Sequence, residues 1–508
     1  MANRYFLNIG VNWGDTANWS DTDGGGGGFS VPTAADDTFF TANSGNCTVN
    51  SGNRVCKTLN FTGYTNIITM TFGITVSGSI TLVAAMTISG TGGLSVNAAC
   101  TLTSNGKTWP NVFTFTGTGF TSTLADNWDI DGQVSFNFTD NSSTKLVNGF
   151  TMNCGGGIVC QQATTSGVAG TTNFVFDGTG NLQFTLNRNT TFQSNITVNT
   201  AGTCNFLGGW KSGNTFTHTA SGAFNSSGTF RPSGCNLDMN GESFDIIELS
   251  VAGGSSTVTL LSDFECNTLT GTSADNSSMS FNGFTIYVNV NFNISTNANA
   301  SLGGTTVVVL QGTGNYSCTG VGFGRHGIDV VINTAGTITS SSQITRIFGS
   351  MTYTAGTFIP PTTLILGTTT GATAITLNTN GIIWNNVTTN GIITVTLSSD
   401  MSITGLLTFG LASAPVIFNG NNFYVSGGVT LNSTTGSISG TTKFIINGSS
   451  TITNNLTSGS WNNDIDISAG ITAIFAVSVK QKGIMAIYGI VAGLLVSTSV
   501  ARGTICFG

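Results

Sequence analysis

The stretch "GTTNFVFDGTGN" at residues 170–181 returns as "GTTVVVLQGTGN" at 304–315 and, more loosely, as "GTTKFIINGSST" at 440–451. Two further sets of phrases follow the same offset: "NGFT" at 148–151, "NGFT" at 282–285 and "NGNN" at 419–422; "NGKTW" at 105–109, "NGESF" at 240–244 and "NGIIW" at 380–384. Repetition at a fixed period marks repeat architectures, and here the period is about 135 residues. We infer three tandem copies, covering approximately residues 85–215, 216–350 and 351–475.

A shorter rhythm runs inside each copy. In the first copy, apolar residues recur about every 20 to 28 residues in short alternating segments. They are Leu102, Leu124, Leu146, Phe174, Ile196 and Phe216. This spacing is typical of one coil of a β-solenoid, which buries its core by stacking on the next coil. The Asn-Gly pairs predict sharp corners, because both residues tolerate positive φ. The sequence predicts an all-β parallel β-helix or solenoid; three tandem β-sandwich domains are the alternative.

The composition supports a β-rich chain with an uncharged surface. Of 508 residues, 39% are hydrophobic and only 7% charged, with 69 Gly and 6 Pro. Thr, Ser, Asn and β-branched residues fit pleated strands joined by tight polar turns. The net charge of -7, without a basic cluster, argues against a nucleic-acid partner, because phosphate binding needs concentrated Lys and Arg.

The two ends differ from the repetitive body at residues 81–475. Residues 1–80, which include Trp13, Trp19 and Pro32, predict a cap or docking module that covers the first coil. The start lacks the basic and apolar segments of a secretory signal, so we expect assembly inside a cell. Residues 476–508 form an apolar tip, in which residues 484–501 are long enough to span a membrane. A membrane helix is the less favoured interpretation, and burial in an oligomer or partner is preferred.

The ten cysteines first suggest a disulfide framework, but the repeat favours buried thiols. Cys100 and Cys235 align with Ile375, and Cys204 aligns with Ile338. A cysteine that alternates with Ile acts as a small hydrophobe, so we expect reduced, buried side chains, Cys266 included. Cys47 and Cys56 lie outside the copies, and their spacing leaves a disulfide open. The only histidines are His218 and His326 and there is no CxxC pair, so we expect no zinc site and no cofactor.

Three sets of residues could carry chemistry. Cleavage of a glycan needs paired carboxylates, and the one acidic concentration in the body contains Asp238, Glu242, Asp245, Glu248, Asp263 and Glu265. Aromatic residues that could stack on a sugar ring share one position in the repeat: Trp109, Phe244 and Trp384. Oxygen ligands for Ca²⁺ occur in "DNWDIDG": Asp126, Asp129 and Asp131.

A structural interpretation is favoured for each set. The acidic residues suit a solvated patch, and Asp263, which aligns with Asp126 and Asp400, suits a turn. The recurrent aromatics suit a core layer. The "DNWDIDG" segment lacks the loop length and terminal Glu of an EF-hand, so we expect a turn that binds no ion.

Several phrases resemble a family of mostly uncharacterised proteins of tailed phages and their metagenomic relatives, regarded as β-helical virion proteins of the tail-fibre or tailspike kind. The resemblance lies in "MANRYF", "VPTAADDTFF", "RVCKTLNFTGYT" at 54–65, "NGKTWPNV" and "LDMNGESF". It implies homotrimers, attachment to other virion proteins through the N-terminal module, and distal contact with the host surface. No catalytic residue carries over from it.

These observations lead to one functional expectation with two alternatives. We expect a non-enzymatic structural virion component of a bacteriophage, a tail fibre or similar appendage, assembled in the host cytoplasm and presenting a polar rod to host glycans. The alternatives are a polysaccharide-cleaving tailspike enzyme, which needs paired carboxylates, and a bacterial surface adhesin, which would carry a secretory signal.

Overall fold

The fold was obtained as a computed structural model. It describes residues 2–140, 143–161, 167–185, 192–219, 222–249, 255–273, 278–296, 301–320, 325–340, 344–347, 349–367, 373–411, 415–433, 436–455, 460–475, 483–492 and 505–507. The chain is nearly all β, with 59% of its residues in strands, and it forms a parallel β-solenoid of about 17 turns. The predicted fold class is confirmed, and the β-sandwich alternative is wrong.

The chain divides into two compact units, Met1–Ile246 and Ile247–Gly508. The boundary lies within β29 (Ser243–Leu249), inside the second of the three sequence copies. The units therefore do not coincide with the copies, because coils stack continuously within a unit wherever the copies begin and end.

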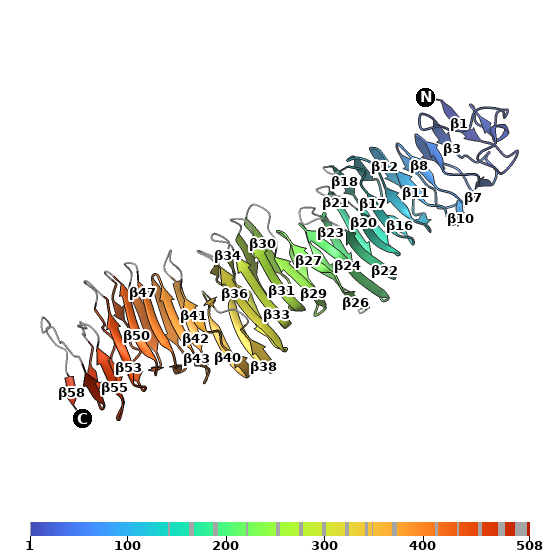
Figure 1. Ribbon diagram of the computed structural model, residues 1–508. Helices are drawn as coiled ribbons and strands as arrows, with labels where there is room; N and C mark the ends of the chain where they lie inside the picture. Colours follow the sequence, from blue (N-terminus) through green and yellow to red (C-terminus); the bar gives the residue numbers. More distant parts are fainter. Residues whose placement is uncertain are drawn as a thin grey trace. The chain divides into compact units, whose positions relative to one another are not determined.

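Parallel ladders build the first unit, and strands of consecutive coils lie side by side (Figure 1). The first ladder contains β1 (Asn3–Phe6), β3 (Asp37–Phe39), β6 (Thr58–Asn60), β9 (Ile80–Thr81), β12 (Cys100–Thr103), β15 (Thr121–Leu124), β18 (Thr144–Gly149), β21 (Gly167–Phe176) and β23 (Phe192–Val198). The second contains β5 (Arg54–Cys56), β8 (Ile74–Val76), β11 (Leu94–Val96), β14 (Phe113–Phe115), β17 (Val134–Asn137), β20 (Gly157–Gln161), β22 (Gly180–Thr185), β24 (Thr203–Ser212) and β26 (Ala223–Ser226).

The remaining elements of this unit complete its coils. A third ladder runs through β13 (Thr108–Trp109), β16 (Trp128–Ile130) and β19 (Thr151–Cys154) to β21 and β23, then β25 (Phe216–His218) and β28 (Asn236–Asp238). A separate sheet contains β4 (Cys47–Val49), β7 (Ile67–Met70) and β10 (Thr87–Gly90). A 3-10 helix, η1 (Thr16–Asn18), precedes β2 (Trp19–Ser20), and β27 (Thr229–Pro232) pairs with β24.

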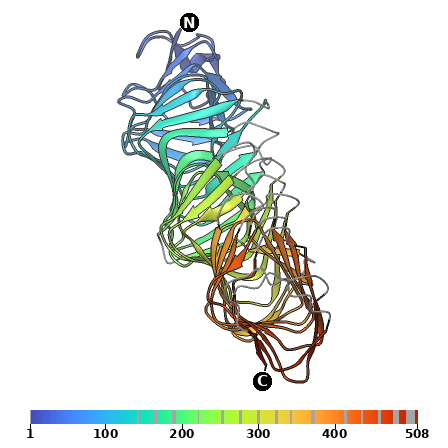
Figure 2. The ribbon, with the colours of Figure 1, turned by 90° about the vertical axis from the view of Figure 1, so that its left-hand side faces the viewer.

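The second unit repeats this plan, and Figure 2 shows its strands following one another from coil to coil. One group contains β30 (Ser255–Leu260), β31 (Phe264–Ser273), β32 (Ser278–Asn282), β33 (Ile286–Thr296), β34 (Ser301–Gly304), β35 (Val307–Leu310), β36 (Gly314–Gly320), β37 (Arg325–His326), β38 (Asp329–Thr339), β40 (Met351–Ile359), β42 (Thr373–Asn378), β45 (Ile393–Leu397), β48 (Val416–Gly420) and β51 (Ile438–Ser439). Another contains β39 (Ile344–Ile347), β41 (Thr363–Leu366), β44 (Asn386–Asn390), β47 (Leu406–Leu411), β50 (Gly428–Ser433), β53 (Ser450–Asn454), β55 (Thr472–Phe475) and β57 (Ile490–Ala492). The last contains β43 (Ile383–Trp384), β46 (Met401–Ile403), β49 (Phe423–Val425), β52 (Phe444–Ile446), β54 (Ile465–Ile467), β56 (Met485–Ile487) and β58 (Ile505–Phe507).

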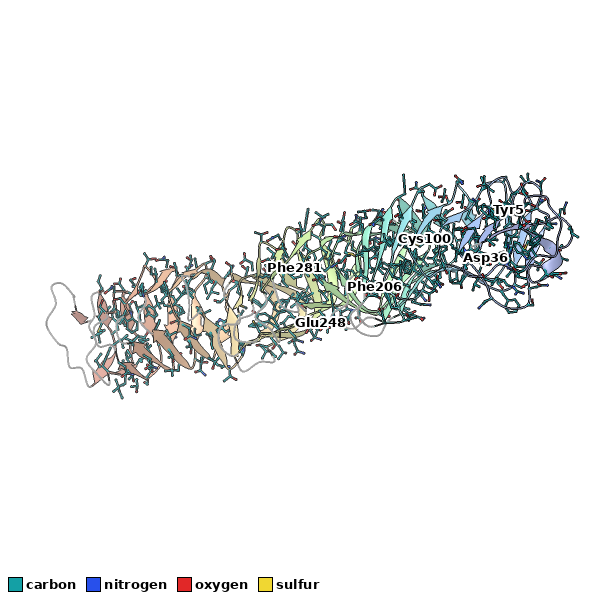
Figure 3. The ribbon with its side chains drawn as sticks, turned by 90° about the horizontal axis from the view of Figure 1, so that it is seen from above. Tyr5, Asp36, Cys100, Phe206, Glu248 and Phe281 are labelled. Atoms are coloured by element: carbon teal, nitrogen blue, oxygen red, sulfur yellow. The ribbon has the colours of Figure 1, made fainter. Side chains whose placement is uncertain are left out.

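Alternation within each strand places apolar side chains inside the coils. Leu102 pairs in register with Leu124, and Phe174 with Ile196, as the spacing predicts, and all four are buried. Phe206 lies among the coils in the same way (Figure 3). The prediction for Leu146 was wrong. It is 38% exposed, and its neighbour Val147 faces the core, because this coil is longer and the inward position moves by one residue.

The three Asn-Gly corners adopt one conformation. Both residues have positive φ in each corner: 49° and 76° at 105–106, 50° and 83° at 240–241, and 38° and 91° at 380–381. The backbone N–H of the residue after each Gly donates a hydrogen bond to the carbonyl oxygen of the residue before each Asn. The N···O distances are 3.0, 3.0 and 2.9 Å. This is the type I′ turn, which requires left-handed backbone at both central positions. The repeat therefore encodes the same corner three times.

A second repeated device joins neighbouring coils and is called here the Asn-Gly/Thr staple. In the first copy, Thr171 donates its N–H to Asn148 Oδ1, and its Oγ1 accepts the N–H of Gly149, both at 3.1 Å. The other two staples join Asn282 and Gly283 to Thr305, and Asn419 and Gly420 to Thr441. These threonines are the first Thr of each "GTT" phrase, so the repeated phrase contains a residue that contacts the neighbouring coil.

An aromatic cluster and an antiparallel strand cover the first coil. β2 pairs antiparallel with β1, whereas β3 pairs parallel with it. The buried rings of the cluster are Phe6, Trp13, Trp19, Phe40, Phe61 and Tyr64. Trp13 and Trp19 are 5.0 Å apart at their centroids, and Trp19 Nε1 donates to the carbonyl of Trp13 at 2.7 Å. Parallel pairing begins at β1, within the residues 1–80 predicted as the N-terminal module.

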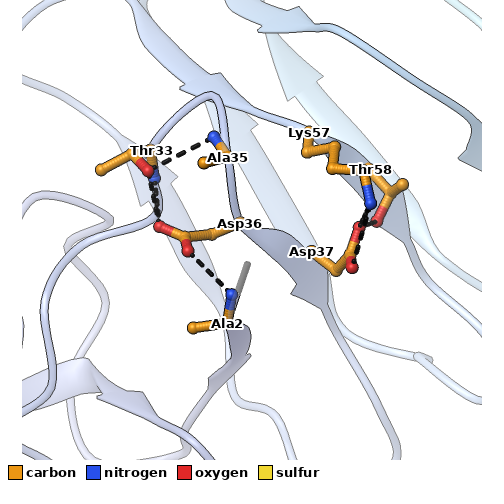
Figure 4. Close-up of polar contacts among 7 residues, drawn as sticks. All are labelled: Ala2, Thr33, Ala35, Asp36, Asp37, Lys57 and Thr58. Atoms are coloured by element: carbon orange, nitrogen blue, oxygen red, sulfur yellow. Dashed lines mark hydrogen bonds and ion pairs between the residues drawn. The ribbon is translucent and has the colours of Figure 1, made fainter.

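Acidic residues fix the loop that leads into β3 (Figure 4). Asp36 accepts hydrogen bonds from the Thr33 hydroxyl at 2.7 Å and from the backbone N–H groups of Thr33 and Ala2. Partial burial opposes ionisation of Asp36, but these hydrogen bonds outweigh it and lower the pKa of the carboxyl. Asp37 forms a 3.3 Å ion pair with Lys57 on the next coil.

The apolar C-terminal stretch continues the solenoid in its described part. β56 pairs with β54, and β57 pairs with β55, both parallel. Ile484 and Tyr488 are more than half exposed beside these strands. Within the described residues, no helix has the length and apolar character needed to span a bilayer. Residues 476–482, 493–504 and 508 of the predicted tip lie outside the described residues.

We predict unequal effects from two Gly-to-Ala substitutions. Gly149 in the staple has φ 108°, and a Cβ there would lie 2.3 Å from the Leu124 carbonyl oxygen of the preceding coil. Gly106 at a corner has φ 76° and open space around such a Cβ. We expect Gly106→Ala to lower the free energy of unfolding by about 1 kcal/mol and Gly149→Ala by about 3 kcal/mol or more, measured by urea denaturation. Equal losses would show that the close approach between coils does not limit stability.

Candidate functional site

The acidic candidates are divided between the two compact units. Asp238, Glu242 and Asp245 belong to the first unit, and Glu248, Asp263 and Glu265 to the second. Asp263 Oδ1 accepts the backbone N–H of Thr285 at 2.7 Å, and Glu265 Oε2 accepts from the Asn289 amide at 3.3 Å. Glu248, labelled in Figure 3, is only 8% exposed. Asp263 and Glu265 therefore each direct one carboxylate oxygen at a neighbouring coil and not at a scissile bond.

The structure also corrects one alignment made from the sequence. Asp263 and Asp400 each accept a backbone N–H from the next coil, from Thr285 and Asn422. In the first copy this role belongs to Asn127, which accepts from Thr151 at 3.1 Å, and not to Asp126. The bonded residues lie 24 positions apart in the first copy and 22 in the other two, so a difference in coil length separates residues that look equivalent in sequence.

The Asp126, Asp129 and Asp131 set is divided among different contacts. Asp126 accepts the backbone N–H groups of Ser104 and Asn105 at 2.7 and 2.6 Å, which anchors the first Asn-Gly corner. Asp129 accepts from the Thr108 hydroxyl at 2.8 Å, and Asp131 is exposed. Among the described residues, no three His, Cys, Asp or Glu side chains gather so that they could hold a metal ion.

Asp177 is a carboxylate that no sequence pattern singles out. Burial raises its pKa, and the nearby Asp129 and Asp131 raise it further. Asp177 comes directly after β21, the strand that contains the repeated phrase. It lies near Asp129 because their coils are stacked. The pattern marks electrostatic repulsion between coils, not a ligand set.

The recurrent aromatics are core residues. Trp109, Phe244 and Trp384 are each only 1% exposed. The Phe244 ring stacks on Phe230 with a centroid distance of 4.7 Å, within a larger group of phenylalanines. Rings buried in this way present no face to a solvent-borne sugar, so the core interpretation of these positions is confirmed.

A surface pocket lies beside the third aromatic position and is called here the corner pocket. Its volume is about 370 Å³, and it is open to solvent. The lining residues are Tyr353, Gly356, Thr357, Phe358, Asn380, Gly381, Ile382 and Ile383. They come from β40 and from the third Asn-Gly corner. None of these side chains is charged, so the pocket combines a phenol ring, an amide, a hydroxyl and aliphatic surface.

Lys145 is the one buried lysine with a strongly shifted pKa among the described residues. Its Nζ donates to the Gly117 carbonyl at 2.6 Å and lies 4.2 Å from the ring centroid of Phe138. Burial lowers its pKa to about 8, although Asp140 acts in the opposite direction. The side chain is fully buried, so this amine serves packing and cation–π contact rather than chemistry on a ligand.

The predicted thiols are buried as expected. Cys100, Cys204, Cys235 and Cys266 are at most 8% exposed, and none of them forms a disulfide. Cys204 pairs with Gly180 just as its aligned partner Ile338 pairs with Gly314. Cys47 and Cys56, both described, also form no disulfide with each other.

Comparison with known proteins gives no match: no protein-family model, curated protein or solved structure matches the chain.

We predict that these thiols make stability fall at high pH. Burial raises the pKa of Cys204 and Cys235 to about 12 each, from 9.0. A raised pKa in the folded state stabilises the fold below pH 9.0, and this contribution is lost as pH rises toward 12. Each titrating thiol adds at most about 1.4 kcal/mol per pH unit to the decline.

The measurement is urea denaturation from pH 8 to pH 11, together with reaction of the thiols with a chromogenic disulfide reagent at pH 8. We expect slow thiol reaction in the native protein, rapid reaction after denaturation, and a shallower pH dependence in Cys204→Val. Fast reaction of all thiols in the native protein, or an unchanged slope in the variant, would contradict the assignment.

Proposed function

We propose that the chain is a non-enzymatic structural component of a bacteriophage particle, a tail fibre or similar appendage, which presents stacked polar side chains to the host surface. The observation that carries the proposal is a column of outward hydroxyls on consecutive coils. Thr388, Thr408, Thr430 and Thr453 pair in register and are partly exposed. Adjacent strands are about 4.8 Å apart, so the column offers one hydroxyl per coil at regular spacing.

Amide side chains extend this uncharged surface. Asn455 donates to Asn432 on the same face at 2.8 Å. In the first unit, Asn225 donates to Asn205 and Asn205 to Asn181, both at 3.2 Å. Amides and hydroxyls both donate and accept hydrogen bonds, so these ladders suit contact with glycans, which offer hydroxyl partners.

The use of carboxylates within the coils supports an attachment role without cleavage. Asp126, Asp263 and Asp400 all bind backbone N–H groups of neighbouring coils. The edge of β1 is already paired with β2, so it is not free to pair with the strands of other chains. This supports docking of the N-terminal end on a defined partner. The proposal includes a homotrimer, the symmetry expected of such an appendage, with other virion proteins at the N-terminal end.

Three measurements test this function: the mass in solution, the labelling of phage particles, and the length of host polysaccharide after incubation with the chain. Sedimentation of the purified full chain should give the mass of three 52.2-kDa chains, and gold-labelled antibodies against it should decorate phage tails in electron micrographs. A monomer in solution would contradict the trimer. Particles without label, or loss of polymer length when host polysaccharide is incubated with the chain, would contradict the structural, non-enzymatic role.

A further inference from the structure

We propose that the corner pocket binds a neutral sugar residue, and that the bound oligosaccharide continues along the outer face of β43, β46 and β49 toward Tyr424. The proposal names a ligand class for the attachment role and rests on that proposed function for the source of the glycan, on the host surface. The chemistry of the pocket supports it independently.

The floor and wall of the pocket are rigid apolar surfaces. Phe358 is 9% exposed, and its ring lies 5.7 Å from the buried ring of Trp384. The hydroxyl of Tyr353 donates to the carbonyl of Gly356, which fixes the orientation of a partly exposed ring. Ile383, which also lines the pocket, is 58% exposed. An ordered aromatic face beside aliphatic surface is what the C–H face of a pyranose ring packs against.

The polar groups of the pocket suit hydroxyl ligands. Asn380 is exposed, and its backbone N–H donates to Ser399 Oγ at 2.9 Å, which holds the corner in place. Its side-chain amide offers donors and an acceptor, and the exposed Thr357 hydroxyl offers both as well. No lining residue is charged. A carboxylated or sulfated sugar would find no cation there, and without a carboxylate the site can bind a glycosidic bond but not cleave it.

The two other Asn-Gly corners differ in the residues that would form this surface. The residue after Gly is Lys107 in the first copy and Glu242 in the second, but Ile382 in the third. The next position holds Thr108, Ser243 and Ile383. Only the third corner therefore combines the turn with an uncharged, apolar rim.

The register of the neighbouring strands supplies a path for a longer ligand. Ile383 pairs with Ser402, and Ser402 pairs with Tyr424, so the three side chains form one outward column. Their neighbours Ile403 and Val425 are buried, which fixes Ser402 and Tyr424 on the outer face. Strands about 4.8 Å apart place Tyr424 about 10 Å from Ile383. A sugar chain that leaves the pocket along the coil axis would meet this second ring.

The test uses the full chain and an array of neutral mono-, di- and hexasaccharides, with sialylated and sulfated glycans as charged probes, followed by calorimetric titration. We expect binding of neutral but not charged glycans. Ile383→Lys should weaken binding by about tenfold or more, whereas Ile392→Lys, an equally charged change at a 42% exposed isoleucine of the same unit, should leave affinity within about twofold. Tyr424→Ala should weaken hexasaccharide binding and leave disaccharide binding unchanged. Circular dichroism confirms that each variant is folded.

The outcomes separate this site from the wider function. Absence of neutral glycan binding, or equal affinity of Ile383→Lys and the unsubstituted chain, overturns the site. If the chain still decorates phage tails in that case, the attachment role stands without this pocket. If the chain binds neutral glycans, Ile383→Lys abolishes this binding, and the chain is absent from phage particles, then the binding site is supported and the virion role is overturned.

Discussion

In a parallel solenoid, the backbone N–H and C=O groups of a strand form their hydrogen bonds with strands of the coils before and after it. The corners, bulges and contacts between coils in this chain all preserve that pairing. Coil length varies along the chain, yet the ladders stay in register: Leu102 meets Leu124 and Ile196 meets Phe216. Differences in length are absorbed at corners and bulges, such as the shift between Ala169 and Asn173. The repeated phrases therefore recur in the chain at positions where two coils contact each other.

The staples and corners show how such fits are made without charge. A type I′ corner needs two residues with positive φ, and Asn-Gly provides them. A staple needs an amide oxygen on one coil and a hydroxyl with its N–H on the next, as in Asn148 and Thr171. The corner closes with a backbone hydrogen bond within one coil, whereas the staple joins two neighbouring coils. A chain with 7% charged residues can hold its coils together because these contacts need no ion pairs.

The same geometry limits where a ligand can bind. Inward positions are filled by close-packed apolar side chains, so large aromatic residues such as Trp109 and Trp384 are lost to the core. Outward positions repeat once per coil and remain available as columns. One concave surface lies where a corner meets a strand of another coil, between β40 and the corner at Asn380. Binding by this chain is accordingly expected along columns and beside corners.

The amino-acid sequence was enough to predict the fold class, the three copies, the Asn-Gly corners and the burial of Cys100 and Cys204, because each follows from a local pattern: a period of two within strands, a fixed period between copies, or a dipeptide with one preferred turn. It was not enough to predict that Val147 and not Leu146 faces the core, that Asn127 and not Asp126 matches Asp263, or that Tyr353 lies beside Ile383. Those facts depend on which residues become neighbours one coil apart. Coil lengths vary by a few residues, and a single residue reverses the face of a strand, so the neighbours are fixed only when all coils pack together.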